Sequence, residues 1–266
     1  DQPRSRGLGD VYKRQDYASA FNYKIQALFF KLCYWVADSC IIVSQSDLKN
    51  IFKVSSLKKK LSYSEHVINT KLFIADVPKE KIFTSIVWMG DEGNVVRKGV
   101  DKALQIFAEL KKIPEFVDYR FVIIGRKGEG EVLVRSIIDK YNLKGSVELK
   151  GEVSEEDKIN LLKQSKYYFQ LSLYEGFGLA ALEALCANNI IIHSGKGGLA
   201  NPIYKEQLLF DIDNDFDSEL LKLVNKLACF TPITSYDNLL EYYDIQRRKD
   251  DFEAIIVNGK SNYKLK

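Results

Sequence analysis

The sequence is poor in the residues that build metal sites and disulfide frameworks. It holds two histidines among 266 residues, which are too few for a metal site made of histidine. Its four cysteines are far apart, and none belongs to a Cys-x-x-Cys pair, so we interpret them as buried thiols in a reducing compartment. We therefore expect a cytoplasmic protein without a bound metal.

Long apolar runs and an excess of positive charge are also missing. The longest apolar stretch near the N-terminus, residues 25–37, is interrupted by Lys31 and is shorter than a membrane-spanning helix. The net charge is +3, of which the first 15 residues contribute +2, so the rest of the chain carries only +1. A protein that binds nucleic acid has a clear basic excess, and we do not expect nucleic acid as a partner.

The first 15 residues differ in character from the rest of the chain. They have no apolar periodicity and no initiator methionine, since Met89 is the only methionine. They resemble a translated sequencing adapter, and we interpret residues 1–15 as a non-native scar that takes no part in the fold. After them the pattern predicts a helix at 21–37, a strand at 39–44 and a short helix at 47–52, a single βα unit with no earlier strand to pair with.

From residue 78 to 235 the predicted strands and helices alternate. The strands are expected near residues 83–89, 119–125, 146–149, 167–171, 190–193 and 207–210. The helices are expected near residues 100–111, 131–141, 155–164, 179–187 and 217–229, with a last helix at 236–257. Strands that alternate with helices of this length predict an α/β fold with a doubly wound parallel sheet of the Rossmann type.

The most informative segment contains two glutamates. The helix after Gly178 is apolar on nearly every side, and Glu183 is its only charge. A carboxylate in a buried helix needs a partner or a polar cavity. Glu175 precedes Gly176 and Gly178 at the C-terminal end of a predicted strand, where ligands of open α/β sheets bind and the first helical turn attracts anions. The pattern predicts a phosphate at the glycines and ribose hydroxyls on Glu183; the alternative is a strained turn and a glutamate satisfied by protein donors.

The motif around these glutamates supports a family resemblance. The spacing Glu-x7-Glu within Glu-Gly-Phe-Gly-Leu-Ala-Ala-Leu-Glu-Ala-Leu closely resembles the signature of the retaining glycosyltransferases of family 4, which have the GT-B fold. The resemblance covers residues 21–210 and implies that Glu183 holds the ribose of a nucleotide. The residues that it implies at the sugar diphosphate are Glu175, Gly176, Phe177, Gly178 and Leu179.

Two cations are predicted beside the diphosphate. Arg97 and Lys98 lie between the first strand of the domain and its helix, where positive charge suits a diphosphate leaving group. Lys98-Gly99 matches the family pattern, but Trp-Met-Gly-Asp at residues 88–91 stands where the family has a Gly-Arg pair. We predict that Arg97 replaces that arginine and group Arg97 and Lys98 with Glu175 as catalytic residues. The alternative is that both cations are ordinary loop charges.

Two further loops complete the predicted site. The loop that begins at Gly125 and Arg126 has the spacing Gly-x2-Gly-x-Gly, which is not the dinucleotide fingerprint, and the resemblance places it beside the nucleotide. Val153 belongs to a turn whose backbone, by the same resemblance, contacts the base. Ser154 in that turn is also a good helix N-cap, which would account for the turn without any ligand.

The resemblance also implies a function and a division of the chain. It implies transfer of a sugar from a nucleotide diphosphate sugar, a UDP-sugar or GDP-sugar, to a glycan or lipid-linked glycan, with retention and without a metal or other cofactor. Residues 16–77 then form the end of an N-terminal acceptor domain and its linker. Residues 78–235 form the donor-binding domain, and residues 236–266 form a helix that crosses back, with a tail.

Because nearly all of the acceptor domain is expected to be missing, we expect the chain alone to be inactive in transfer. Peripheral contact with the inner face of a membrane is expected only through that domain. Two other functions stay open. One is a nucleotide-binding protein without catalysis, which the lost Gly-Arg pair favours. The other is a nicotinamide-dependent dehydrogenase, which the glycine loop and Glu148 at the next predicted strand end favour.

Overall fold

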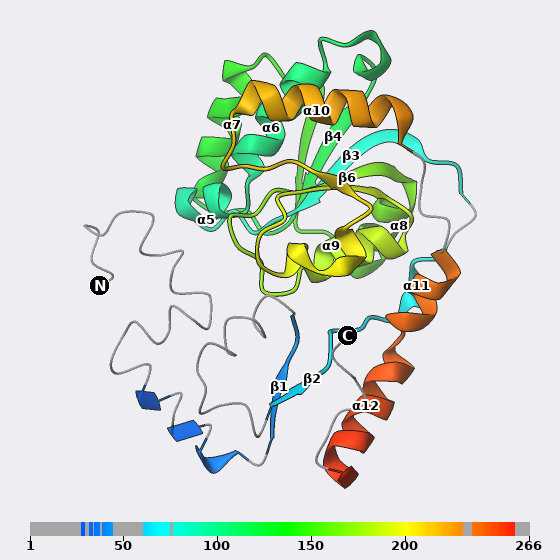
Figure 1. Ribbon diagram of the computed structural model, residues 1–266. Coiled ribbons are helices and arrows are strands. Elements are labelled where there is room, and N and C mark those ends of the chain that lie inside the picture. Colours follow the sequence, from blue (N-terminus) through cyan, green and yellow to red (C-terminus); the bar gives the residue numbers. More distant parts are fainter. Residues whose placement is uncertain are drawn as a thin grey trace.

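The computed structural model describes residues 28–29, 32–33, 35–37, 39–44, 61–74, 77–230 and 236–258. Its main body is an open sheet of six parallel strands in the order β5-β4-β3-β6-β7-β8 (Figure 1). These strands are β3 (Glu80–Ile86), β4 (Arg120–Ile124), β5 (Val147–Gly151), β6 (Ser165–Gln170), β7 (Ile190–His193) and β8 (Leu208–Leu209). The predicted parallel α/β sheet is confirmed. The strand order reverses between β3 and β6, which makes this pair the topological switch point.

Helices cover both faces of the sheet, as Figure 1 shows. The helices are α5 (Glu92–Arg97), α6 (Val100–Leu110), α7 (Gly130–Lys140), α8 (Glu155–Gln164), α9 (Leu179–Cys186) and α10 (Phe216–Cys229). Helices α6, α7 and α10 bury apolar side chains against one face, and α8 and α9 bury theirs against the other. On the first face the Phe83 ring stacks on Tyr167 and Phe169, with centroid distances of 4.6 and 5.1 Å. Burial on both faces explains why the strands are continuous apolar runs in the sequence.

Side-chain caps fix the starts of several helices. The Asp157 N–H donates to Ser154 Oγ (3.1 Å) at α8, and the Ser218 N–H donates to Asp215 Oδ2 (2.9 Å) at α10. At α5 the Asn94 N–H donates to Asp91 Oδ1 (2.6 Å). Helix α5 was not predicted, because its six residues include glycine and asparagine and are too few to show a helical period.

The N-terminal part holds a strand pair that corrects one prediction. The short strand β1 (Cys40–Ile42) was expected to have no neighbour, but it pairs in parallel with β2 (Leu61–Tyr63). With only three residues after a run of lysines, β2 gave no signal in the sequence. The described residues of the predicted helix at 21–37 include helical positions with exposed apolar side chains, and the predicted helix at 47–52 lies outside the described residues. Within the described part of the chain, no helix is long and apolar enough to cross a membrane.

The predicted C-terminal helix is two helices. They are α11 (Tyr236–Tyr242) and α12 (Ile245–Asn258), and the chain turns between them at Tyr243 and Asp244. At this turn the Ile68 N–H donates to the Tyr243 carbonyl (3.0 Å), so the segment after β2 runs against the break. A helical period continues across the break in the sequence, and this tertiary contact decides where the helix ends.

A buried polar cluster holds α12 to the segment after β2, and we name it the α12 clasp. It consists of Tyr63, Ser64, Glu65, Tyr243, Arg248 and Asp251. Arg248 donates to the carbonyls of Ser64 (2.7 Å) and Glu65 (2.6 Å), and the Ser64 hydroxyl donates to Asp251 (2.7 Å). The hydroxyls of Tyr63 (2.5 Å) and Tyr243 (2.9 Å) donate to the Glu65 carboxylate. Residue Glu65 is only 2% exposed. Each charged side chain of the clasp therefore has a hydrogen-bond partner within the clasp.

Candidate functional site

The first glutamate of the sequence motif, Glu175, lies in the loop that joins β6 to α9, and the second, Glu183, lies inside α9. This loop leaves the C-terminal edge of the sheet at the switch point, the position where α/β sheets bind ligands. Gly178 begins α9 with φ +89°, a left-handed conformation that favours glycine. A Cβ on the exposed Gly176 would meet no atom within 4 Å, so this side of the loop is open. The free N–H groups at the start of α9 therefore face an approachable edge.

Lys98 and Glu175, which the sequence predicts as catalytic residues, form an ion pair. Lys98 Nζ lies 2.9 Å from Glu175 Oε2 and 3.1 Å from Oε1, although 77 residues separate them. Gly99 permits this approach: its φ is +70°, and a Cβ there would lie 2.0 Å from the Leu171 carbonyl oxygen. The Leu173 N–H also donates to the Arg97 carbonyl (2.9 Å), which ties the end of α5 to the loop after β6.

The Arg97 guanidinium points to Asn94 and not to Glu175. Its Nε and Nη2 donate to Asn94 Oδ1 at 3.2 and 2.5 Å, one turn earlier on α5. The structure thus brings the Lys98 ammonium, but not the Arg97 guanidinium, into contact with Glu175. The replacement of the missing family arginine by Arg97 stays a prediction.

Two residues behind Glu175 were missed in the sequence. Ser172 Oγ donates to Glu175 Oε2 at 3.0 Å, and Gln170 Nε2 donates to the same oxygen at 3.3 Å. Both side chains are buried, and Gln170 is the last residue of β6. A polar residue at the buried end of an apolar strand was the available signal, because a buried amide needs hydrogen-bond partners.

Glu183 is held by a residue that the sequence did not single out. Lys158 Nζ on α8 lies 2.9 and 3.0 Å from the two Glu183 oxygens and 2.6 Å from Glu155. The side chains of Lys158 and Glu183 are 16% and 17% exposed, so each is mostly buried but still reaches solvent. The buried carboxylate therefore has a protein partner, as in the alternative kept open above. Two contacts leave free acceptor capacity on a carboxylate, so the pair does not exclude ribose hydroxyls.

Burial and charge act in opposite directions on this pair. Burial raises the pKa of Glu183 above its usual range, although the hydrogen bond and charge of Lys158 lower it. Burial lowers the pKa of Lys158, but hydrogen bonds to Glu155 and Glu183 outweigh burial and raise it overall. Lys158 therefore stays charged and favours the ionised form of Glu183.

A second glycine loop packs on the Glu175 loop. The Gly198 N–H donates to the Glu175 carbonyl (2.6 Å). A Cβ on Gly197 would lie 2.1 Å from that carbonyl oxygen, and one on Gly198 would lie 2.5 Å from the Phe177 Cα. Residues Gly197–Ala200 form a 3-10 turn in close backbone contact with the motif.

Backbone packing explains the glycines of the loop at Gly125, which the sequence predicts beside the nucleotide. A Cβ on Gly125 would lie 2.0 Å from the Val87 carbonyl oxygen, and one on Gly128 would lie 2.6 Å from that of Met89. The glycines are thus needed where this loop meets the loop after β3. The Arg126 side chain is exposed. Glu148 is the second residue of β5 rather than its end, so neither feature now supports a dehydrogenase.

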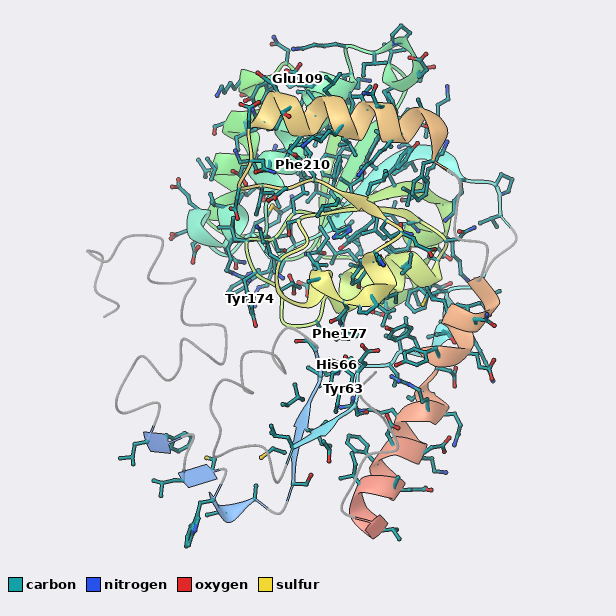
Figure 2. All side chains as sticks on the ribbon, in the orientation of Figure 1. Tyr63, His66, Glu109, Tyr174, Phe177 and Phe210 are labelled. Carbon is teal, nitrogen blue, oxygen red and sulfur yellow. The ribbon has the colours of Figure 1, made fainter. Side chains whose placement is uncertain are left out.

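The remaining predicted residues surround the start of α9 and of α8. Phe177 is buried and meets the His66 ring edge to face, at a centroid distance of 5.2 Å. Figure 2 shows Phe177, His66 and Tyr63 in succession between α9 and β2. Leu179, the first residue of α9, is 43% exposed, and Val153 packs partly buried against a small apolar cluster beneath α8. The contact of the Val153 backbone with a base stays a prediction.

The fold and the site first define a class. The doubly wound parallel sheet matches the fold of solved GT-B glycosyltransferases. Sucrose-phosphate synthase from Thermosynechococcus elongatus superposes with a TM-score of 0.73 at 20% identity, over 94% of this chain and 65% of that one. HepE from Anabaena, solved in complex with UDP and glucose, superposes with a TM-score of 0.68 at 13% identity, over 90% of this chain and 67% of that one. These likenesses establish the GT-B fold.

The family follows from the sequence comparison. Residues 93–228, about half of the chain, match the family described as glycosyl transferases group 1, and the chain belongs to this family. A GDP-mannose:cellobiosyl-diphosphopolyprenol alpha-mannosyltransferase from Xanthomonas oryzae is 32% identical over 163 residues, 53% of this chain and 40% of that protein. One of the subunits of the human phosphatidylinositol N-acetylglucosaminyltransferase is 30% identical over 105 residues, 40% of this chain and 21% of that protein. The chain thus spans less than half the length of either relative.

Proposed function

We propose that this glycosyltransferase chain binds the nucleotide diphosphate sugar donor of a retaining transfer reaction. The observation that carries the proposal is the placing of Lys98, Glu175 and Glu183 around the loop at the switch point. Lys98 supplies a cation for the diphosphate, and the open start of α9 supplies backbone N–H donors. Glu183 supplies acceptors for the ribose hydroxyls.

The mechanism follows from which groups develop charge. As the bond between sugar and diphosphate breaks, negative charge grows on the leaving phosphate, and Lys98 with the α9 N–H groups stabilises it. By the family resemblance, that phosphate takes the proton of the acceptor hydroxyl on the same face of the sugar, which gives retention. Glu175, fixed between Lys98 and two buried donors, is placed to accept a hydrogen bond from the sugar.

The acceptor belongs to the same proposal. The name of the Xanthomonas relative specifies a diphosphopolyprenol-linked disaccharide, and that of the human relative specifies phosphatidylinositol. Both named molecules are lipids or are linked to one. This supports a lipid-linked acceptor and sugar transfer at the cytoplasmic face of a membrane. A nucleotide-binding role without catalysis is the second candidate, because Arg97 turns to Asn94 rather than to Glu175.

Thermal unfolding with added ligands tests the donor class. We expect UDP, GDP or one of their sugar derivatives to raise the Tm, since a ligand at 100 times its Kd stabilises the folded state by about 2.7 kcal/mol. NADH serves as the control for a dehydrogenase. A rise with NADH and none with UDP or GDP would overturn the proposal, and nucleotide binding without donor hydrolysis or transfer would favour the second candidate.

A further inference from the structure

A buried glutamine lies directly behind Glu175. Gln170 is 5% exposed, and each side of its amide has a partner. Its Oε1 accepts from the Tyr168 hydroxyl (3.1 Å), and its Nε2 donates to Ser172 Oγ (2.8 Å) and to Glu175 Oε2 (3.3 Å). The Tyr168 hydroxyl in turn accepts from the Ile86 N–H (3.3 Å), so its proton is free to go to Gln170. This chain of donors fixes the amide with its nitrogen toward Glu175.

The contacts make the two oxygens of Glu175 unequal. Among the described residues, Oε2 receives three donors, from Lys98, Ser172 and Gln170, whereas Oε1 receives only Lys98 at 3.1 Å. A carboxylate oxygen accepts about two hydrogen bonds in good geometry. Oε2 is therefore saturated, and Oε1 keeps an acceptor position for a further donor.

We propose that Gln170 is a positioning residue that anchors Oε2 of Glu175 and thereby presents Oε1 to a hydroxyl of the donor sugar. The proposal rests on the proposed function. A buried amide costs more to desolvate than an apolar side chain of the same size, and here the cost is offset by the bonds to Tyr168, Ser172 and Glu175. Groups that bind substrate keep their geometry when buried side chains lock them from behind, and Tyr168 and Ser172 lock Gln170 in that way.

The first test replaces the amide with an apolar group of similar size. In Gln170→Leu, we expect the affinity for UDP-N-acetylglucosamine or GDP-mannose, whichever the wild type binds, to fall roughly 3- to 10-fold, the equivalent of one hydrogen bond. Affinity for UDP or GDP alone should not change. Gln207→Leu is the matched control: Gln207 directly precedes β8 and is 7% exposed, but its Oε1 accepts from the Ile191 N–H of β7 (2.8 Å). Equal losses for the nucleotide with and without sugar would overturn the proposal.

A second variant gives a signature that loss of folding cannot imitate. Gln170→Glu keeps the shape, but near neutral pH it places a second carboxylate beside Glu175. Two carboxylates at this distance do not both stay ionised easily, so one of them takes up a proton as the pH falls. The resulting O–H group restores the hydrogen bond between residue 170 and Glu175. We expect weak binding of the nucleotide sugar at pH 8 and recovery toward wild-type affinity at pH 5.5. A flat ratio of variant to wild-type affinity across this range would overturn the role of Gln170. A wild-type chain that binds neither sugar nucleotide would instead refute the proposed function.

Discussion

Replacing Lys158 should shift the pH dependence of nucleotide binding. If Glu183 holds the ribose as a carboxylate, binding is complete above the pKa of Glu183 and weakens as the pH falls through it. Burial raises this pKa, and Lys158 opposes that effect from 2.9 Å. Without the lysine, Glu183 keeps only the burial and the unfavourable charge of Glu155, so the pH at which binding weakens must rise.

The size of the effect follows from the geometry. Lys158 Nζ lies 2.9 Å from Glu183, well within the distance at which an opposite charge lowers a carboxyl pKa, so its removal raises the pKa of Glu183. Lowering the pH from 8.5 to 6 weakens nucleotide binding in both proteins. The loss of affinity should be roughly ten times larger in Lys158→Met than in the wild type.

Isothermal titration of UDP and GDP between pH 5.5 and 8.5 measures the effect. Lys163→Met is the control, because Lys163 lies on the same helix and has no carboxylate partner among the described residues. A 2′,3′-dideoxy nucleotide should show no difference between Lys158→Met and the wild type. Identical pH midpoints for the two proteins with the full nucleotide would refute the reasoning.

Three further predictions concern other groups. Glu183→Ala should weaken nucleotide binding by roughly 1.5–3 kcal/mol but a dideoxy nucleotide much less, and equal losses in calorimetry would make Glu183 structural. Lys98→Ala should weaken binding of UDP or GDP more than that of the nucleosides; an unchanged diphosphate Kd would remove Lys98 from the site. Burial lowers the pKa of Lys79 to about 8, where its Nζ caps the ends of α8 and α9 through the carbonyls of Lys163 (2.9 Å) and Ala187 (2.5 Å). The unfolded chain then binds more protons above pH 8, so the free energy of unfolding should rise between pH 8 and 10 relative to Lys79→Met, and parallel urea-denaturation profiles would contradict this.

Local patterns predicted the sheet because its central strands β3, β4, β6 and β7 are buried on both faces. The apolar runs around Phe83 and Phe169 mark strands wherever they occur, and the caps at Ser154 and Asp215 mark helix starts. The elements that were missed or misread depend on partners distant in sequence. β2 exists because it pairs with β1, and the last helix is broken because Tyr243 meets Ile68.

The same distinction applies to the site. Glu175 and Glu183 were found because a charge in an apolar helix and two nearby glycines are visible in one short segment. Lys158 and Gln170 were not, because a lysine on α8 and a glutamine at a strand end acquire their meaning only through packing. The role of Gly197 and Gly198 is likewise visible only in the structure. They have no side chain, and this allows their backbone to pack closely on the Glu175 loop.

The α12 clasp determines how the chain can be shortened. Removing the chain from Tyr243 onward would leave the Glu65 carboxylate without the Tyr243 hydroxyl and the Ser64 and Glu65 carbonyls without Arg248. Removing the residues before Ser64 would take away the Tyr63 hydroxyl and the strand pair that fixes it. The first described strands and the last described helix therefore behave as one unit of stability, although the six-stranded sheet lies between them in sequence. A shortened chain has to keep both ends or replace the polar residues of the clasp together.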